Sequence, residues 1–135
     1  MISGVNSAAR KELERQIKER RLENEVILTG FVENEERNTL YRYCRAFLFP
    51  SVFEGFGMPP VEAMLFGSIV VTTDRSSIPE VTQGKANYVS EPYDADAWIR
   101  VMKNPEDHIA EFDFDAYDQM KLAKRYYNLL AEKLG

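Results

Sequence analysis

The sequence is poor in the residues that build disulfide frameworks and metal sites. It has one cysteine, Cys44, and one histidine, His108, among its 135 residues. A single cysteine excludes a disulfide within the chain and leaves no zinc-binding motif, which fits a reducing cytoplasm. His108 lies in a polar segment with no partner nearby in the sequence, so we assign it no catalytic role.

Long apolar runs and an excess of basic charge are absent as well. No stretch approaches the roughly 20 apolar residues that span a bilayer, and the first residues lack the apolar core of a signal peptide. The net charge is −5, which disfavours a nucleic-acid partner because phosphate backbones attract basic surfaces. The basic residues between Arg10 and Arg21 alternate with glutamates, a pattern typical of a solvated helix face.

What the sequence does contain is an alternation of short apolar runs and helical patterns. Strands are predicted at residues 26–29, 46–49, 69–72 and 86–89, and the main helices at 7–22, from Asn34, 61–66, 94–102 and 115–134. Strand and helix in turn, with short connections, predict βαβ units and a Rossmann-like parallel α/β sheet flanked by helices. With no repeat and no linker, we expect one domain over residues 1–135.

Three local patterns make sharper predictions. The run 46–49 is apolar at every position, which indicates a strand buried on both faces. In the helix that begins at Asn34, the candidate buried positions are Leu40, Tyr43 and Cys44. Ser77 and Glu80 have the spacing of a capping box, in which the serine hydroxyl would cap a short helix.

The loops after the strands are the expected place for a ligand, because open parallel sheets bind ligands beyond the carboxyl ends of their strands. This selects residues 30–34, 50–60 and 73–79. The middle loop contains Gly55 and Gly57, whose backbone amides can approach a ligand closely. It leads into a helix N-terminus, where amides and the helix dipole favour an anion such as a diphosphate.

Two carboxylates, Glu54 and Glu62, bracket this loop. Pro59 and Pro60 exclude one continuous helix between them, so both side chains could converge on one crevice. Carboxylates accept paired hydrogen bonds from vicinal hydroxyls, which sugars and riboses present. A glutamate in a first helical turn is also stabilised by the helix dipole without any ligand, and Gly-x-Gly alone is typical of turns.

Residues 49–80 closely resemble the signature region of glycosyltransferase family 4. Its hallmark is a glutamate, seven residues and a second glutamate, preceded by a Pro-Ser pair, here Glu54, Glu62 and Pro50-Ser51. The recognisable stretch extends from about residue 26 to residue 92. Such a long ordered set of matches is a specific signal.

The resemblance implies the nucleotide-sugar domain, the second of the two Rossmann-like domains of a GT-B enzyme that transfers sugars with retention and without a divalent metal. Glu54 would contact the donor sugar at the reacting centre, and Glu62 would hold the ribose hydroxyls. The backbone amides that would face the sugar hydroxyls and the diphosphate are those of Gly55, Phe56, Gly57 and Met58. The turn that would border the base is formed by Gly30, Phe31 and Val32.

The chain also departs from the family pattern. The family's domain opens with a strand–helix unit whose loop supplies an arginine and a lysine for the diphosphate, whereas residues 1–4 resemble the second strand. We therefore expect a truncated domain, inactive alone, with an unpaired sheet edge that favours a homodimer. The acceptor site would come from an acceptor-binding domain or partner chain, and the full enzyme would be cytoplasmic, with peripheral contact at the inner membrane face.

Three functions remain open at this point. The leading one is the donor domain of a glycosyltransferase of polysaccharide or glycoconjugate biosynthesis. The second is a non-catalytic remnant, or a nucleotide-sugar-binding module without an acceptor domain. The third, an ordinary dinucleotide-binding Rossmann domain, lacks a G-x-G-x-x-G loop after its first strand. Arg75 could reach a phosphate from its loop or serve only as a surface turn residue.

Overall fold

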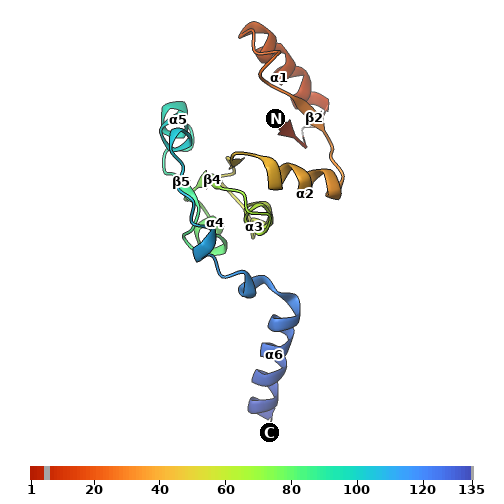
Figure 1. The fold of residues 1–135 in the computed structure, drawn as a ribbon, viewed down its shortest axis with the longest axis vertical. Coiled ribbons are helices and arrows are strands. Elements are labelled where there is room, and N and C mark those ends of the chain that lie inside the picture. The colour runs from red at the N-terminus through yellow and green to blue at the C-terminus, as the bar shows by residue number, and fades with distance from the viewer. Residues whose placement is uncertain (5–6, 135) are drawn as a thin grey trace. The chain divides into compact units, whose positions relative to one another are not determined.

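The structure, a computed structural model, describes residues 1–4 and 7–134 of the chain (Figure 1). The chain divides into two compact units, Met1–Leu40 and Tyr41–Gly135, and each is taken by itself below. That the whole chain is one domain therefore stays a prediction. Within the described ranges no helix combines the length and the apolar character that crossing a membrane requires.

The first unit is built on two parallel strands. β1 (Ile2–Ser3) pairs with β2 (Leu28–Gly30), and α1 (Ser7–Glu19) lies between them in the chain. The Ile2 amide donates to the Ile27 carbonyl at 2.8 Å, and the Gly4 amide donates to the Gly30 carbonyl at 2.7 Å. The predicted strand–helix–strand order of this part of the chain is confirmed.

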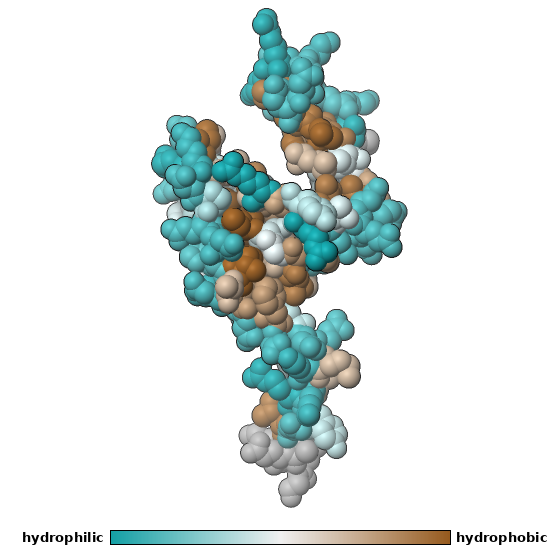
Figure 2. Space-filling view, viewed as in Figure 1, coloured by the Kyte–Doolittle hydropathy of each residue, from teal (hydrophilic) through white to brown (hydrophobic). Residues whose placement is uncertain are grey.

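The charges of α1 pair with one another along its surface. Arg15 lies 2.6 Å from Glu12 and 2.5 Å from Glu19, and the hydrogen bonds from Arg15 hold the pKa of Glu12 at about 2. Hydrophilic residues cover most of α1 in the view of Figure 2. These exposed pairs contribute little stability, and they confirm the solvated helix face that the alternating charges predict.

The second unit holds a three-stranded parallel sheet in the order β3-β4-β5. Leu48 of β3 stands opposite Val71 of β4, and Thr72 stands opposite Tyr88 of β5. The parallel α/β fold is thus confirmed. Its elements are β3 (Phe47–Phe49), α3 (Met58–Leu65), β4 (Val70–Thr73), α4 (Ile78–Val81), β5 (Asn87–Val89), α5 (Ala95–Lys103), the 3₁₀ helices Ile109–Glu111 and Phe114–Tyr117, and α6 (Gln119–Leu134), with α2 (Asn34–Tyr43) preceding β3.

Side chains of β4 alternate between two apolar clusters. Val70 packs in a cluster with Met64 of α3, and Val71 packs in a second cluster with Ala97 of α5. All four residues of β4 are buried, at most 2% exposed. Strands covered on both faces in this way are typical of parallel sheets between helices.

Two burial predictions are wrong. Leu48 is 41% exposed, because β3 is the edge strand of its sheet and one side of it has no paired neighbour there. Tyr43 is 79% exposed and Cys44 is exposed, because Tyr41 takes the buried position and packs edge-on against Phe47 at 5.0 Å. A homodimer through an unpaired sheet edge stays a prediction.

The last helix begins at Gln119, four residues later than the sequence predicts. Asp113 accepts the amide of Asp115 at 3.0 Å and caps a 3₁₀ helix. Asp118 then accepts the amides of Met120 and Lys121 at 2.9 and 3.1 Å. Two aspartate caps therefore divide the predicted helix into a short 3₁₀ turn followed by α6.

Gly57, directly before α3, has φ 87°, in the left-handed region that glycine adopts most easily. A methyl group at this position would lie 3.7 Å from Val81 Cγ2 and 3.8 Å from Glu54 Cβ, which are ordinary contacts. The backbone conformation, rather than a lack of space, is therefore what requires glycine here.

Gly57→Ala should lower the free energy of unfolding by about 1–2 kcal/mol, because alanine is strained in the left-handed region. Urea unfolding followed by circular dichroism measures the change. Gly55→Ala is the matched control, since Gly55 has ordinary φ and nothing within 4 Å of the added methyl. Equal losses in both variants would contradict the assigned conformation of Gly57.

Met64→Ala should lower the free energy of unfolding by about 2–5 kcal/mol, because the Met64 side chain is 1% exposed in the main apolar cluster. The neighbouring Leu65→Ala serves as control, since Leu65 is 49% exposed on the same helix. A surface change of this kind alters stability by only about 0.5 kcal/mol. A Met64 variant as stable as the Leu65 variant would show that α3 is not packed as described.

Candidate functional site

The carboxyl ends of β3 and β4 bring two loops together. Residues 50–57 follow β3, and residues 74–77 follow β4, its hydrogen-bonded parallel neighbour. Since parallel strands end at the same edge of a sheet, both loops lie where the sequence predicts ligand binding.

Hydroxyl groups of Thr73, the last residue of β4, and of the loop after it hold the carbonyls of residues 50–57. Thr73 donates to the Ser51 carbonyl at 2.5 Å, and Ser76 donates to the Glu54 carbonyl at 2.8 Å. Ser77 Oγ lies 2.9 Å from the Phe56 carbonyl and 3.2 Å from the Glu54 carbonyl. The path of the loop is therefore fixed by side chains on β4 and on the turn before α4.

These bonds correct the capping-box prediction for Ser77. Ser77 does precede α4, but its side chain makes no hydrogen bond to the helix amides. Its hydroxyl donates to a carbonyl of the loop after β3 instead. A hydroxyl has one proton to donate, and here a partner about twenty residues away in the sequence takes it.

The amides of the same loop remain without partners. Within the described ranges no hydrogen bond is donated by the backbone N–H of the residues that the resemblance places at the sugar and diphosphate, Gly55, Phe56, Gly57 and Met58. Pro59 and Pro60 stand next in α3 and have no N–H, so the helix offers an anion only the Gly57 and Met58 amides. The carbonyls of this loop already accept hydrogen bonds, whereas these amides donate none. The loop can therefore donate hydrogen bonds to a ligand rich in oxygen atoms.

An apolar base lies under this loop. Gly57 sits against Ile78 and Val81 of α4, and the Phe56 ring lies 6.3 Å from that of Tyr117, edge to face. Burial raises the pKa of Tyr117, so its hydroxyl stays protonated and donates to the Val81 carbonyl at 2.5 Å. Phe56 itself is 51% exposed, which leaves part of its ring available to a ligand.

The two predicted glutamates occupy different parts of this arrangement. Glu54 is half-buried in the loop, with its Cβ against Gly57 at the start of α3. Glu62 is half-buried in the second turn of α3, not in the first. The dipole acts mainly within the first turn, so it gives Glu62 less stabilisation than the sequence suggests. Convergence of the two carboxylates on one ligand stays a prediction.

The predicted base-bordering turn belongs to the first unit. Gly30 ends β2 with φ 73°, Phe31 is 82% exposed and Val32 is half-buried. Beside them stands a residue that the sequence analysis missed. Arg10 of α1 has Nη1 3.6 Å from the place where a Gly30 methyl would be, and its Nη2 donates to the Leu28 carbonyl at 3.3 Å.

Arg10 therefore sets a positive charge at the carboxyl end of β2. Its Nε also donates to Glu14 at 2.8 Å, so the charge is partly compensated. One feature of the sequence could have identified Arg10: it lies in the first turn of a helix that follows a strand. In parallel sheets the N-terminal end of such a helix faces the ligand site.

Arg75 lies in the loop after β4 and is held by neighbours. Its Nη2 donates to the Ser90 carbonyl at 2.6 Å, and its Nε lies 3.3 Å from Asp74. Ser90 follows β5 directly, so Arg75 joins the ends of two strands. These contacts favour the surface-turn role over the phosphate-binding one.

Comparison with known proteins agrees with this arrangement of elements. The family model described as glycosyl transferases group 1 matches residues 1–107. The chain is 39% identical over 80 residues, 59% of its length, to the serotype-specific mannosyltransferase WbdA of Escherichia coli, of which it covers 10%. It is 32% identical over 118 residues, 80% of its length, to the O-antigen chain mannosyltransferase RfbU of Salmonella typhimurium, of which it covers 33%.

A third relative, the O-antigen chain mannosyltransferase B of Escherichia coli, is 46% identical over 68 residues, half of this chain and 18% of the relative. The chain thus spans at most a third of the length of these relatives. No solved structure matches it. Membership of family 4 in particular stays a prediction. Because the family model covers most of its length, the chain belongs to the group 1 glycosyl transferases.

Proposed function

We propose that this chain is the nucleotide-sugar-binding part of a larger glycosyltransferase of polysaccharide biosynthesis, and that the sugar it binds is mannose. Group 1 membership and three relatives named as mannosyltransferases support this proposal, two of them acting on O-antigen chains by name. The observation that carries it is the loop of unpaired amides between Glu54 and Met58, held in place by serine and threonine hydroxyls.

Each part of the loop has a role in the proposal. The amides of Gly57 and Met58, at the positive end of α3, bind the diphosphate. Glu62 accepts hydrogen bonds from the two ribose hydroxyls, and Glu54, at the opposite end of the loop, accepts from hydroxyls of the sugar. The bond between the anomeric carbon and the diphosphate breaks, the oxygen of an acceptor hydroxyl forms the new bond with retention of configuration, and the proton of that hydroxyl passes to the leaving diphosphate.

Two parts of the proposal concern the complete protein, namely the source of the acceptor-binding surface and the location of the reaction. The acceptor-binding surface would be supplied by another part of the same protein or by a partner chain. We place the complete enzyme in the cytoplasm, peripheral to the inner face of the membrane. A module that binds the nucleotide-sugar without transferring it is the second candidate, because the site's features serve binding whether or not transfer follows.

Isothermal titration calorimetry with guanosine and uridine diphosphate sugars tests donor binding. We expect the chain to bind a mannose nucleotide, and Glu62→Gln to weaken binding at least about tenfold, since a hydrogen bond to a charged group contributes about 1.5–3 kcal/mol. Glu106→Gln is the matched control. The Glu106 carbonyl accepts from Asn87, the first residue of β5, so Glu106 stands at the opposite end of the sheet.

Folded chain that binds none of these nucleotides would overturn the proposal. Equal weakening by the Glu62 and Glu106 variants would show that the carboxylate of Glu62 is not in the site. Binding with transfer by the complete protein supports the enzyme, and binding without transfer by that protein supports the module.

A further inference from the structure

The stretch that follows α5 lies along the connection between α4 and β5. The two stretches run in opposite directions, and their contacting pairs are, in order, Gln83 with Asp113, Lys85 with Glu111 and Asn87 with Glu106. Residues 106–117 are here named the supporting segment. Most of this segment lies beyond residue 107, where the match to the family model ends, so the signature region does not account for its contacts.

Two amide side chains fix the backbone of the supporting segment. Gln83 Nε2 donates to the Asp113 carbonyl at 2.9 Å, and Gln83 Oε1 accepts the Asp113 amide at 2.8 Å. Asn87 pairs in the same way with Glu106, at 2.9 and 2.7 Å. Because each side chain supplies both a donor and an acceptor to one residue, the pairing sets the direction of the segment as well as its position.

One ring of the supporting segment, that of Tyr117, is held at two points. It stacks on Phe112 with ring centroids 5.7 Å apart, and Phe112 is 5% exposed in the main apolar cluster. The Tyr117 hydroxyl donates to the carbonyl of Val81, the last residue of α4, where a helix carbonyl has no partner within the helix. A ring held at its face and at its hydroxyl has little freedom to move.

Tyr117 contacts the loop of residues 54–58, the donor loop, through the ring of Phe56. The two rings lie 6.3 Å apart at 82°, the edge-to-face arrangement that aromatic pairs prefer. Phe56 stands between two glycines, which restrict the backbone least. The bond from Ser77 holds only the Phe56 carbonyl. The contact with Tyr117 is therefore a second restraint, which limits rotation of the peptides on either side of Phe56.

We propose that Tyr117 is a positioning residue of the donor site, which acts through the Phe56 ring to hold the amides of the donor loop in the arrangement that binds the nucleotide-sugar. Tyr117 itself touches no ligand in this proposal. Amides that are already ordered lose less conformational entropy when a ligand binds, so the affinity is higher. The identity of the ligand rests on the proposed function, whereas the ordering of the loop is a property of the chain alone.

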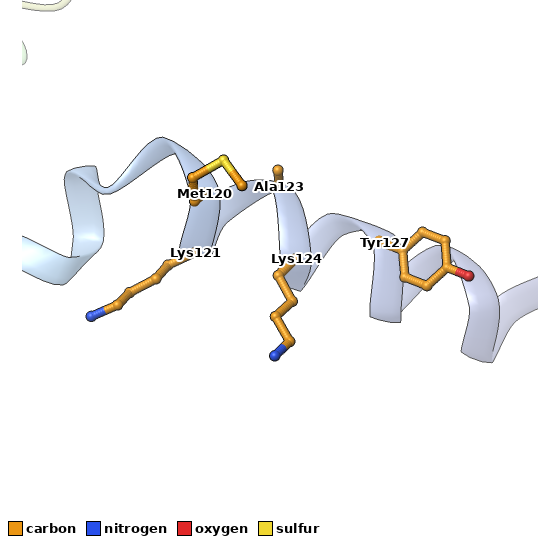
Figure 3. Close-up of a pocket in the computed structure, with 5 residues that line it drawn as sticks. All are labelled: Met120, Lys121, Ala123, Lys124 and Tyr127. Carbon is orange, nitrogen blue, oxygen red and sulfur yellow. The ribbon is translucent and has the colours of Figure 1, made fainter.

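Beyond the supporting segment the chain continues into α6. A shallow hollow there is lined by five residues, all of α6, namely Met120, Lys121, Ala123, Lys124 and Tyr127 (Figure 3). A hollow bounded by one helix does not enclose a small ligand, so we assign it no nucleotide-sugar. Lys121 pairs with Asp115 at 2.5 Å, which joins the start of α6 to the 3₁₀ helix that carries Tyr117. The role proposed for this part of the chain is therefore support of the donor loop.

NMR relaxation of backbone amides tests the ordering of the donor loop in the full 135-residue chain. Tyr117→Leu removes the ring and should lower the order parameters of residues 55–57 from about 0.85 to below about 0.6, the range of flexible backbone. Tyr117→Phe keeps the ring and should leave them nearly unchanged. Phe114→Leu is the matched control, because Phe114 lies in the same 3₁₀ helix and packs on Phe112 at 4.9 Å.

Calorimetry with guanosine diphosphate mannose tests the consequence for binding. Tyr117→Leu should weaken binding about three- to tenfold, because the ligand must then order the loop, whereas Tyr117→Phe should restore it to within about twofold. A side chain that only stabilises the fold would lower the midpoint of unfolding without changing the affinity of the folded protein. Unchanged order parameters in folded Tyr117→Leu would overturn the proposal, and so would unchanged affinity.

A second pair of variants keeps the test decisive where Tyr117→Leu does not fold. Gln83→Glu removes the amide donor to Asp113, which caps the 3₁₀ helix, and should lower the order parameters of the donor loop. Asn87→Asp makes the same change at Glu106 and should not lower them, so equal effects would count against the proposal. If the unaltered chain binds neither guanosine nor uridine diphosphate sugars, the proposed function fails, and the order parameters alone decide whether Tyr117 positions the loop.

Discussion

Two buried threonine hydroxyls hold the candidate site to the sheet. Thr72 and Thr73, the last residues of β4, are both 0% exposed, and a buried hydroxyl without a hydrogen-bond partner is destabilising. Thr72 donates to the Phe49 carbonyl at 2.8 Å, and Thr73 donates to the Ser51 carbonyl. Burying these hydroxyls between β3 and β5 therefore requires that the chain after β3 stay beside β4 for two further residues.

The remaining features of the site follow from that constraint. Once the loop is fixed at Ser51, the hydroxyls of Ser76 and Ser77 reach the carbonyls of Glu54 and Phe56. Carbonyl and amide of one peptide point in roughly opposite directions, so fixing the carbonyls toward α4 leaves the amides directed away from it. Donors that are already oriented lose little conformational entropy when a ligand arrives.

The sequence predicts the positions of helices and strands better than it predicts the hydrogen bonds and burial of their side chains. The run 69–72 is apolar and β-branched and becomes β4, displaced by one residue, and Asp94 caps α5 by accepting the Asp96 amide at 2.9 Å. Such predictions rest on local patterns. Ser77 shows where they end: its spacing fits a capping box, but the competing carbonyl of Phe56 is brought near only by the sheet.

The same distinction explains the errors in burial and the residue that was missed. An apolar run predicts a strand for residues 47–49, but whether Leu48 is covered depends on which strands pair, and β3 lies at an edge. Arg10 is one of several alternating charges in α1, and only the pairing of β1 with β2 sets it beside Gly30. The signature region was specific because it fixes backbone chemistry, two glycines and two prolines around a helix start, which the local sequence determines.

Neutral backbone amides and positively charged side chains stabilise a leaving diphosphate in different ways. A lysine or arginine attracts a diphosphate strongly before and during the reaction, whereas an amide dipole is weaker and acts at hydrogen-bond distance. As the bond to the anomeric carbon breaks, negative charge grows on the leaving diphosphate oxygen, and a donor fixed against that oxygen stabilises it more in the transition state than in the ground state. In the proposed donor site the Ser77 hydroxyl holds the Glu54 and Phe56 carbonyls, so the amides at Gly57 would stay in place as this charge grows. In the proposed donor site such a loop would stabilise the leaving diphosphate during transfer, and the same oriented amides would serve binding of the nucleotide-sugar without transfer.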